Sequence, residues 1–464
     1  MRELACDVAV IGAGTAGLAA RRAAASAGAR TVLIERGPGG TTCARVGCMP
    51  SKLLIAAGAA AHAARNTDLF GIRVSGVSVD GPAVLARVRA ERDRFVGGVL
   101  EGVDALPEDG RIAGSARFAD GGTLLVGEDA RIRFRAAIIA TGSSPIVPDP
   151  LRGLGARVLT TDSLFEMPDL PPSLAVLGAG AVGIEIAQAM ARLGVAVTVI
   201  DAGKTVAGLR EPDLARQAAA IFGAELDLHL GARLRAAVPE GDGVRLDWTD
   251  RHGRAQVTRA RRVLAAAGRS PNLDDLDLAA AGLRPGENGV PDFDHRTLVC
   301  PGAPILIAGD ADAWRPVLHE ASRQGRIAGA NAAALAAGRP VQAVTPWTRL
   351  AMVFTHPQAA AIGAPYAPEA GDRLIGAMDF SDQGRARVEG HNRGGIRVWA
   401  DRDGRLLGGE MLGPGVEHLA HRLADAVADG LTARDAVERP IYHPTVEEGL
   451  KTAMSNIVQS TSKC

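Results

Sequence analysis

A glycine-rich pattern occurs twice in this chain and constrains the fold more than any other feature. Residues 7–35, DVAVIGAGTAGLAARRAAASAGARTVLIE, read as an apolar strand, a glycine-rich turn, an alanine-rich helix and a second strand that ends on an acid. Residues 174–201, LAVLGAGAVGIEIAQAMARLGVAVTVID, repeat this order with the same spacing. The order predicts a βαβ dinucleotide-binding unit. We therefore expect an α/β chain that carries two such modules.

Each glycine of the turn has its own task. Gly12 makes the tight turn, Gly14 lets a pyrophosphate approach the backbone at the helix N-terminus, and Gly17 lets the helix pack closely on the strand. The corresponding glycines of the second module are Gly178, Gly180 and Gly183. A similar strand and turn later closes each module, AAIIATGSSP at 136–145 and VLAAAGRSP at 263–271. The proline-rich segment between the modules, from about 148 to 172, is expected to be a crossing linker.

An acid ends the second strand of each module. Glu35 follows Gly12 by 23 residues, and Asp201 follows Gly178 by the same number. A carboxylate at this position binds ribose hydroxyls and repels a 2′-phosphate, so Asp201 favours NAD over NADP. Lys204 and Arg210 follow closely and leave the opposite preference open.

Composition excludes several classes of partner. The chain has 464 residues, which predicts two to four domains, and its 52 basic and 52 acidic residues balance. That balance argues against binding of nucleic acid or of a membrane surface. The first residues, MRELACDVAVIGAG, resemble no signal peptide, and no apolar stretch is long enough to span a bilayer, so we expect a cytoplasmic protein.

Two of the five cysteines, Cys43 and Cys48, lie five positions apart in GPGGTTCARVGCMPSK. They could form a structural disulfide, half of a metal site or a redox pair. An odd number of scattered cysteines disfavours a disulfide framework. The other cysteines and the His-Pro sequences lack zinc-ligand spacing, so no metal site is expected.

Taken together, the two modules and the cysteine pair resemble the pyridine nucleotide–disulfide oxidoreductases. The family motif Gly-Thr-Cys-x-x-x-Gly-Cys-x-Pro-Ser-Lys appears here from Thr41 to Lys52, with Thr in place of the first Gly. The family's second flavin-binding sequence appears in ILIAGDAD, and its C-terminal signatures appear as FTHPQAAAIG at 354–363 and HPTVEE at 443–448. The likeness covers the whole chain.

This resemblance implies the cofactors and most of the site. FAD is expected at the first module, with Thr42, Lys52, Thr141, Gly142, Gly309 and Asp310, and NAD at the second, with Gly268. Cys43 and Cys48 are then a redox-active disulfide. Lys52 is expected to pair with Glu185 beside the flavin. His443 is the expected proton carrier, held by Glu448, and it serves the cysteines of the other subunit of a homodimer.

Helix geometry adds a constraint on the cysteine pair. Residues five apart in a regular helix have Cα atoms about 8–9 Å apart, beyond the limit of about 7 Å for a disulfide. The pair therefore requires a distorted start of the helix that follows, for which Gly47 supplies freedom and Pro50 a break. The N-terminal dipole of that helix, SKLLIAAGAAAHAA, would stabilise a thiolate.

The expected architecture has two Rossmann-like dinucleotide-binding domains and a C-terminal α+β dimerisation domain. The expected ranges are 1–150 with 272–345 for FAD, 151–271 for NAD and 346–464 for the interface. Oxidation of dihydrolipoamide on a carrier protein with NAD⁺ fits the motifs best. A reductase of another small disulfide or of metal ions, and a flavin-bound binding subunit with vestigial catalysis, are the alternatives.

Several departures from the family bear on the substrate. Thr41 replaces the usual Gly, and Arg45 stands between the cysteines where lipoamide enzymes usually have Asn. Arg45 could lower a thiolate pKa, favour an acidic partner or face solvent. Mercuric reductases end in a vicinal cysteine pair, whereas this sequence has the single Cys464, which we expect to be dispensable.

Overall fold

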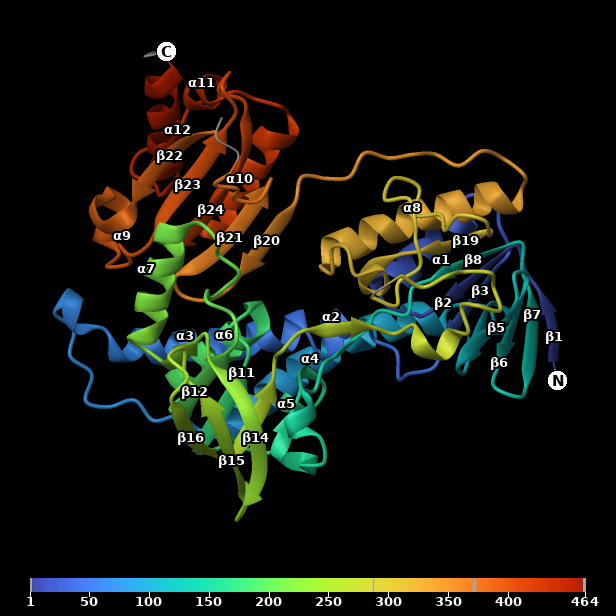
Figure 1. Cartoon of the computed structure of the whole chain (residues 1–464), viewed down its shortest axis with the longest axis horizontal. Coiled ribbons are helices and arrows are strands. Elements are labelled where there is room, and N and C mark those ends of the chain that lie inside the picture. Colours follow the sequence, from blue (N-terminus) through green and yellow to red (C-terminus); the bar gives the residue numbers. More distant parts are fainter. Residues whose placement is uncertain (1, 287, 370–372, 462–464) are drawn as a thin grey trace. The chain divides into compact units, whose positions relative to one another are not determined.

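The computed structural model describes residues 2–286, 288–369 and 373–461 (Figure 1). Its residues group into two compact units, each built from three segments of the chain. The first unit comprises Met1–Pro50, Arg89–Ile146 and Gly268–Pro346. The second comprises Ser51–Val88, Val147–Ala267 and Trp347–Cys464. Two helices, α3 (Cys48–Arg65) and α4 (Gly81–Asp104), have residues in both.

A five-stranded parallel sheet forms the centre of the first unit. Its strands, in spatial order, are β19 (Ile305–Ile307), β8 (Ala136–Ile139), β2 (Val8–Ile11), β3 (Thr31–Glu35) and β4 (Arg111–Ala113). All residues of β2 and β8 are buried, as expected for a sheet that is covered on both faces. One face packs on α1 (Thr15–Ser26) and α8 (Leu318–Ala336), which also pack on each other. The first βαβ module is thus β2, α1 and β3.

Two smaller sheets complete the first unit. One has the order β1 (Arg2–Ala5), β7 (Ala130–Arg133), β6 (Thr123–Val126) and β5 (Ala116–Asp120). Its apolar side chains join those of the central sheet in a second core cluster. The other sheet pairs β9 (Ser143–Pro145) with β18 (Arg269–Pro271). These two strands follow the strands that close the first and the second module, so the ends of the two modules meet here.

The second unit repeats the parallel sheet. Its order is β10 (Val158–Leu159), β17 (Arg262–Ala265), β11 (Ser173–Leu177), β12 (Ala196–Asp201) and β13 (Asp227–Leu230), with all pairs parallel. Helix α6 (Ala181–Arg192) connects β11 to β12, as α1 connects β2 to β3. The three-stranded antiparallel sheet of β14 (Arg233–Glu240), β15 (Gly243–Thr249) and β16 (Ala255–Ala260) packs beside it. The closing strands β8 and β17 lie next to β2 and β11, as the repeated sequence predicts.

The segment between the modules is more than a linker. It contributes β10 to the second parallel sheet and includes α5 (Thr161–Leu164). Leu159, Leu164 and Phe165 are buried in the core of that unit. The expectation of a crossing linker was wrong here because the apolar residues between the prolines pack into the core.

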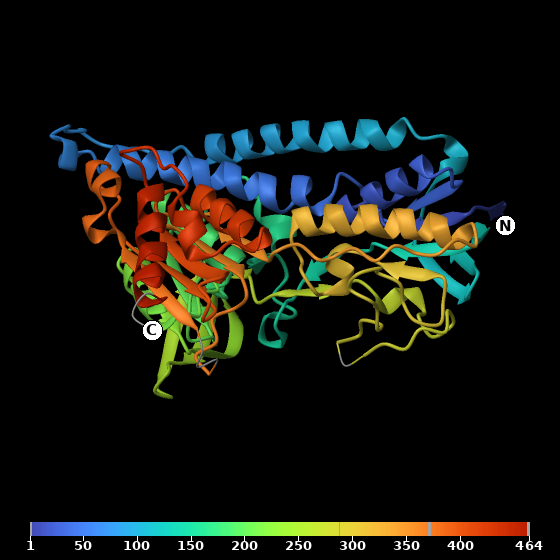
Figure 2. The same cartoon turned by 90° about the horizontal axis from the view of Figure 1, so that it is seen from above.

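An antiparallel sheet forms the C-terminal part of the second unit (Figure 2). Its strands are β20 (Leu350–Val353), β21 (Gln358–Gly363), β24 (Leu406–Gly413), β23 (Gly395–Ala400) and β22 (Leu374–Asp379). Helices α10 (Val416–Ala428) and α12 (Glu447–Thr461) cover one face, and α7 (Pro212–Gly223) contacts β23 and β24. The short helices α9 (Gly384–Val388) and α11 (Ala433–Val437) complete this region.

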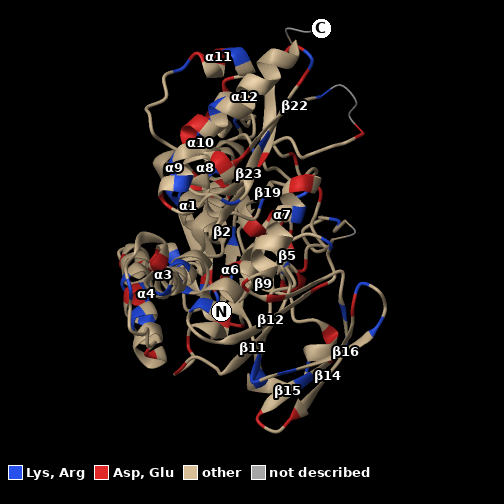
Figure 3. Ribbon diagram, turned by 90° about the vertical axis from the view of Figure 1, so that its left-hand side faces the viewer, with Lys and Arg blue, Asp and Glu red and all other residues tan. Residues whose placement is uncertain are grey.

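Charge is distributed as the balanced composition predicts. In Figure 3 the basic and acidic residues are interspersed along the elements. Within the described part of the chain, no helix is long and apolar enough to cross a bilayer.

Candidate active site

The first glycine-rich turn has the geometry that its sequence predicts. Gly12 has φ +106°, and a Cβ there would lie 2.3 Å from the carbonyl oxygen of Ala140 in the neighbouring strand segment. A Cβ on Gly17 would lie 1.8 Å from the Gly12 oxygen. Around Gly14, in contrast, no atom would lie within 4 Å of an added Cβ, and α1 begins directly after it. The turn therefore leaves open the place where a pyrophosphate would meet the helix N-terminus.

The acid at the end of β3 holds this turn. Glu35 accepts hydrogen bonds from the N–H groups of Ala13, at 2.6 Å, and Gly37, at 2.7 Å. Its carboxylate thus lies beside the glycine-rich turn, where a ribose would follow a bound pyrophosphate.

The second turn repeats this arrangement. Gly178 has φ +112°, and a Cβ there would lie 2.3 Å from the Ala266 oxygen, while a Cβ on Gly183 would lie 1.9 Å from the Gly178 oxygen. The space around Gly180 is again open. Asp201 accepts hydrogen bonds from the N–H groups of Ala179 and Gly203, as Glu35 does in the first module. The two modules are therefore equivalent in hydrogen bonding as well as in sequence.

The Gly309–Asp312 turn follows β19 and carries several buried polar groups. Asp310 accepts a hydrogen bond from the Ser143 hydroxyl at 2.8 Å, and Gln324 accepts one from the Gly309 N–H at 2.6 Å. Three atoms here are buried without a hydrogen-bond partner: Thr141 Oγ1, Asp312 Oδ2 and Gln324 Nε2. Such orphaned groups fit a polar ligand, so this turn suits the ribityl or phosphate part of a flavin nucleotide.

Asp312 was not predicted as a site residue. Its carboxyl is buried, and desolvation raises its pKa to about 7 although the Trp314 N–H hydrogen bond opposes that rise. Only its position two residues after Asp310 could have drawn attention to it.

The cysteine pair lies on two helices rather than one, which confirms the argument from helix geometry. Cys43 belongs to the short α2 (Thr42–Arg45), and Cys48 is the first residue of α3. Cys43 is partly buried and Cys48 is exposed. Gly47 lies between them in a tight place, because a Cβ there would lie 3.0 Å from the Thr42 oxygen. Pro50 does not break the helix, because it lies in the first turn of α3, where proline is tolerated.

Thr41 has a strained backbone. Its φ of 59° and ψ of 148° lie in a region that is almost restricted to glycine. Its hydroxyl accepts a hydrogen bond from the Ala44 N–H at 3.2 Å and so caps α2. Arg45, four residues on, is partly buried and its Nε lacks a partner.

Lys52 and Glu185 form the predicted ion pair. Lys52 Nζ lies 2.8 Å from Glu185 Oε2, with the Lys52 side chain 35% exposed and that of Glu185 6% exposed. Phe354, which sequence reasoning left unassigned within its FTHPQ signature, joins them. Its N–H donates to Glu185 Oε1 at 2.8 Å, and its ring centroid lies 4.6 Å from Lys52 Nζ. The lysine is therefore fixed by a carboxylate and by a cation–π contact.

His443 and Glu448 also contact each other as expected. His443 Nδ1 lies 3.0 Å from Glu448 Oε1, and the Thr445 N–H donates to Glu448 Oε2 at 3.2 Å. These hydrogen bonds, that of His443 first, lower the pKa of Glu448. The side chain of His443 is 80% exposed, so Nε2 is available to a group outside this chain's own core.

Two other cysteines are unsuited to redox exchange. Cys6 and Cys300 are buried in the core of the first unit, and burial raises the pKa of each thiol to about 12. Within the described ranges, no cluster of three or more His, Cys, Asp or Glu side chains could hold a metal ion. Cys464 lies outside the described residues.

The comparison with protein families decides the class. The profile of the pyridine nucleotide-disulphide oxidoreductases matches residues 6–334, and that of their dimerisation domain matches residues 350–454. The chain belongs to this family. It is an FAD-dependent pyridine nucleotide–disulfide oxidoreductase with Rossmann-like domains, and FAD and NAD are its cofactors. The dimerisation domain supports a homodimer.

Relatives with more than one activity resemble the chain. It is 32% identical to a dihydrolipoyl dehydrogenase of Halobacterium salinarum over 96% of this chain and 95% of the relative. It is 33% identical to a mercuric reductase of Streptomyces lividans over 98% of this chain and 97% of the relative. The solved structure of LpdA from Mycobacterium tuberculosis matches with a TM-score of 0.83 at 24% identity, covering 98% of this chain and all of that one. The family assignment is thus firm, and it is compatible with more than one substrate.

Proposed function

We propose that this enzyme oxidises dihydrolipoamide, on a carrier protein or as a small dithiol, and reduces NAD⁺. The observation that carries the proposal is the start of α3, where Cys48 is the first residue and Lys52, one turn on, pairs with Glu185. A thiolate at Cys48 gains from the dipole of α3, because Cys48 is the first residue of that helix. Dihydrolipoyl dehydrogenases among the relatives support the substrate.

In this proposal the two nucleotides occupy the two glycine-rich turns. The residues that would hold FAD are Gly12, Gly14, Gly17, Glu35, Thr42, Lys52, Thr141, Gly142, Gly309 and Asp310. Those that would hold NAD are Gly178, Gly180, Gly183, Asp201 and Gly268. Bound FAD supplies the two-electron carrier between the cysteine pair and NAD⁺.

The proposed exchange begins at Cys43. One substrate thiolate attacks the Cys43 sulfur of the oxidised pair, the Cys43–Cys48 bond breaks, and Cys48 leaves as a thiolate. The second substrate sulfur then attacks the first substrate sulfur in the mixed disulfide. The bond to Cys43 breaks, Cys43 leaves as a thiolate, and the cyclic disulfide of lipoamide closes. The substrate loses two electrons and two protons, and the cysteine pair gains the electrons. With NAD⁺ as the final acceptor, each turnover yields lipoamide, NADH and one proton.

His443 would move the protons. Glu448 accepts from Nδ1, which leaves Nε2 as the base that takes a proton from a substrate thiol. Because Glu448 has a lowered pKa, its carboxylate stays ionised in mild acid and continues to orient the ring. We propose that His443 acts on the cysteines of the partner subunit, in keeping with its high exposure.

A reductase that transfers electrons from NADH to another disulfide or to metal ions is the second candidate. Mercuric reductases of similar identity favour it.

The main proposal also includes the domain ranges given in the sequence analysis and a location in the cytoplasm. Cys6 and Cys300, which are buried as thiols in the core, fit a reducing compartment.

Steady-state kinetics with four substrate pairs test the proposal. Dihydrolipoamide with NAD⁺ should give a kcat/KM at least about a hundredfold above dihydrolipoamide with NADP⁺. It should also exceed the values for NADH with glutathione disulfide and with mercuric ion. A dominant mercuric activity that is lost in Cys464→Ser would overturn the proposal in favour of the second candidate. The absence of turnover with every pair would indicate a vestigial site.

A further inference from the structure

Helix α6 holds one loop of the second unit at two successive points. The loop, residues 354–357, connects β20 to β21 and lies within the FTHPQ signature. Glu185 accepts a hydrogen bond from the Phe354 N–H group at 2.8 Å. Gln188, one turn further along α6, accepts one from the His356 N–H group, also at 2.8 Å. Because positions three apart lie on the same face of a helix, both side chains reach the loop from one side.

The amide of Gln188 is fully engaged in this contact. Its Nε2 group donates to the His356 oxygen at 2.8 Å and to Glu225 Oε2 at 2.9 Å. Both backbone groups of His356 are therefore paired with one side chain, which is only 3% exposed. Carbonyl and carboxylate oxygens can only accept hydrogen bonds, so they fix the orientation of the amide. Gln188 thus determines where the backbone of the loop lies.

Glu225, which follows α7, is the charged end of this network. Arg192 donates from Nε and from Nη2 to its two oxygens, and Nη2 also donates to the His356 oxygen at 3.1 Å. Burial opposes the ionisation of Glu225, yet the hydrogen bond from Arg192 holds its pKa below the ordinary value. An ionised acceptor forms a stronger hydrogen bond to Gln188 than a neutral one would.

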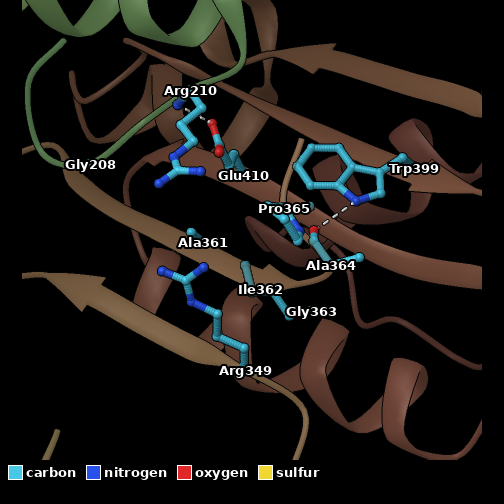
Figure 4. A pocket seen from close by; sticks show the side chains of 11 residues that line it. Gly208, Arg210, Arg349, Ala361, Ile362, Gly363, Ala364, Pro365, Trp399 and Glu410 are labelled. Carbon is cyan, nitrogen blue, oxygen red and sulfur yellow. Dashed lines mark hydrogen bonds between the residues drawn. The ribbon is translucent and has the colours of Figure 1, made fainter. Parts of the chain in front are cut away.

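The helix that precedes Glu225 is also held at its start. In Figure 4 the carboxylate of Glu410, from β24, lies next to the backbone nitrogen of Arg210. Its Oε2 accepts hydrogen bonds from the N–H groups of Arg210 and Glu211, both at 2.8 Å, directly before α7. Helix α7 is therefore attached to the antiparallel sheet at one end and to α6 at the other, which fixes the position of Glu225.

The loop in turn positions the ion pair of Lys52. The Phe354 N–H group occupies Glu185 Oε1, and Lys52 Nζ lies 2.8 Å from the other oxygen, Oε2. The Phe354 ring lies 4.6 Å from the same Nζ. The Lys52 side chain is 35% exposed, so these contacts restrict a group that could otherwise move toward solvent. A shift of the loop would disturb the carboxylate and the ring together.

We propose that Gln188 is a positioning residue for the redox reaction. It fixes the backbone of the 354–357 loop, and Phe354 then holds Lys52 and Glu185 in one arrangement. This inference rests on the proposed function, in which Lys52 is one of the residues that hold FAD. A cation that is fixed beside the flavin favours its reduced, electron-rich form, so Gln188 contributes to the reduction potential through Lys52.

The reduction equilibrium of the flavin with a reference dye tests this role. It is measured in the FAD-loaded dimer that carries Cys43→Ser and Cys48→Ser, so that the cysteine pair takes no electrons. Lys52→Met should shift the equilibrium toward oxidised flavin. Gln188→Leu, which keeps the size of the side chain but removes its hydrogen bonds, should shift it the same way by about threefold, because the cation–π contact of Lys52 is no longer fixed. Gln217→Leu, on α7, is the matched control and should cause no shift.

Combining the two variants shows whether the effect passes through Lys52. In Lys52→Met, adding Gln188→Leu should cause no further shift, because the group that Gln188 positions is gone. An equal further shift would overturn the proposal. So would an unchanged equilibrium in Gln188→Leu when Lys52→Met does shift it. If Lys52→Met itself has no effect, the proposed place of Lys52 at FAD is wrong, and this inference fails with it.

A second substitution keeps the test independent of how well Gln188→Leu folds. Gln188→Glu retains the acceptor for the His356 N–H group but brings a second carboxylate next to Glu225, so it should also shift the equilibrium toward oxidised flavin. Glu225→Gln in the same protein supplies a donor to that carboxylate and should reverse most of the shift. A shift in Gln188→Glu that Glu225→Gln leaves unchanged would overturn the role of this network.

Discussion

Thr41 is a residue whose backbone conformation opposes its side chain. A β-branched residue at φ 59° and ψ 148° is under strain of about 1–3 kcal/mol, yet its hydroxyl caps α2 just before Cys43. The family motif usually has glycine at this position. The sequence shows the replacement by threonine but does not show what it does to the backbone. The structure supplies the consequence, because glycine would adopt the same backbone without strain.

Thr41→Gly should stabilise the protein by about 1 kcal/mol, since relief of strain outweighs the lost cap and the greater freedom of the unfolded chain. Thr41→Ala removes the cap and keeps most of the strain, so it should destabilise by about 1 kcal/mol. Urea midpoints of the FAD-loaded proteins measure both. Destabilisation by both substitutions would show that the hydroxyl matters more than the backbone strain.

Asp312 gives a prediction that depends on pH. Its pKa is about 7 in the folded state, against an ordinary value of 3.8, so between about pH 4 and 7 the folded state binds more protons than the unfolded state. Its contribution to stability is therefore full at low pH and is lost as pH rises through 7. Asp312→Asn should unfold at a higher temperature than the unmodified protein at pH 8, by the equivalent of about 4 kcal/mol, and this difference in stability should shrink toward pH 4.5.

The exposed Asp109→Asn serves as the control for this measurement and should show no such change. If the unfolding temperatures of Asp312→Asn and the unmodified protein differ by the same amount at pH 8 and at pH 4.5, the carboxyl does not titrate as proposed.

For single residues, the sequence predicted the side-chain pairs of the site but not the other residues that pack around them. The Lys52–Glu185 and His443–Glu448 pairs follow from motif positions, and both are present. The place of Phe354 beside Lys52 and the burial of the Asp312 carboxyl depend on packing between segments that are distant in sequence. Local patterns carry no information about such packing.

Among the secondary-structure elements, too, local features could be predicted from the sequence and long-range packing could not. The two βαβ modules could be predicted because each is contiguous and its spacing is fixed by the turn. The packing of α1 on α8 could not, since these helices are separated by about 300 residues. It depends on glycines in α8: a Cβ on Gly325 would lie 2.2 Å from the Ala16 oxygen of α1.

A side chain at Gly325 should therefore displace α1, whose N-terminus forms the first glycine-rich turn. Gly325→Val should lower both the thermal midpoint and the FAD content of the purified protein, with an overpacking cost of about 1–3 kcal/mol or more. Ala330→Val, on the exposed side of the same helix, is the control. Flavin content and melting temperature that match the control would contradict this account of the helix contact.

The whole molecule is organised in a way that no local pattern reveals. Residues 51–88 lie within the first expected domain, yet they group with the second compact unit. Leu54 and Leu85 bury their side chains in the same core as Leu264. Chain order alone could not indicate this, because α3 and α4 contribute residues to both units.

Shared active sites in a homodimer give a prediction at this scale. Mixing the inactive variants Cys43→Ser and His443→Gln should yield heterodimers in which one of two sites has both groups. Such heterodimers should recover up to about half of the dihydrolipoamide turnover, since each site needs one group from each chain. Heterodimers verified by mass that remain inactive would indicate that each site is built within one chain.

The absorption spectrum of the oxidised flavin in two cysteine variants tests the central claim most directly. If Cys48 is the sulfur beside the flavin and Cys43 the one that exchanges with substrate, Cys43→Ser leaves a Cys48 thiolate in contact with FAD. That variant should show a long-wavelength charge-transfer band, and Cys48→Ser should bind FAD equally well without the band. A band in Cys48→Ser alone, or in neither variant at full FAD occupancy, would contradict the assignment of the two sulfurs.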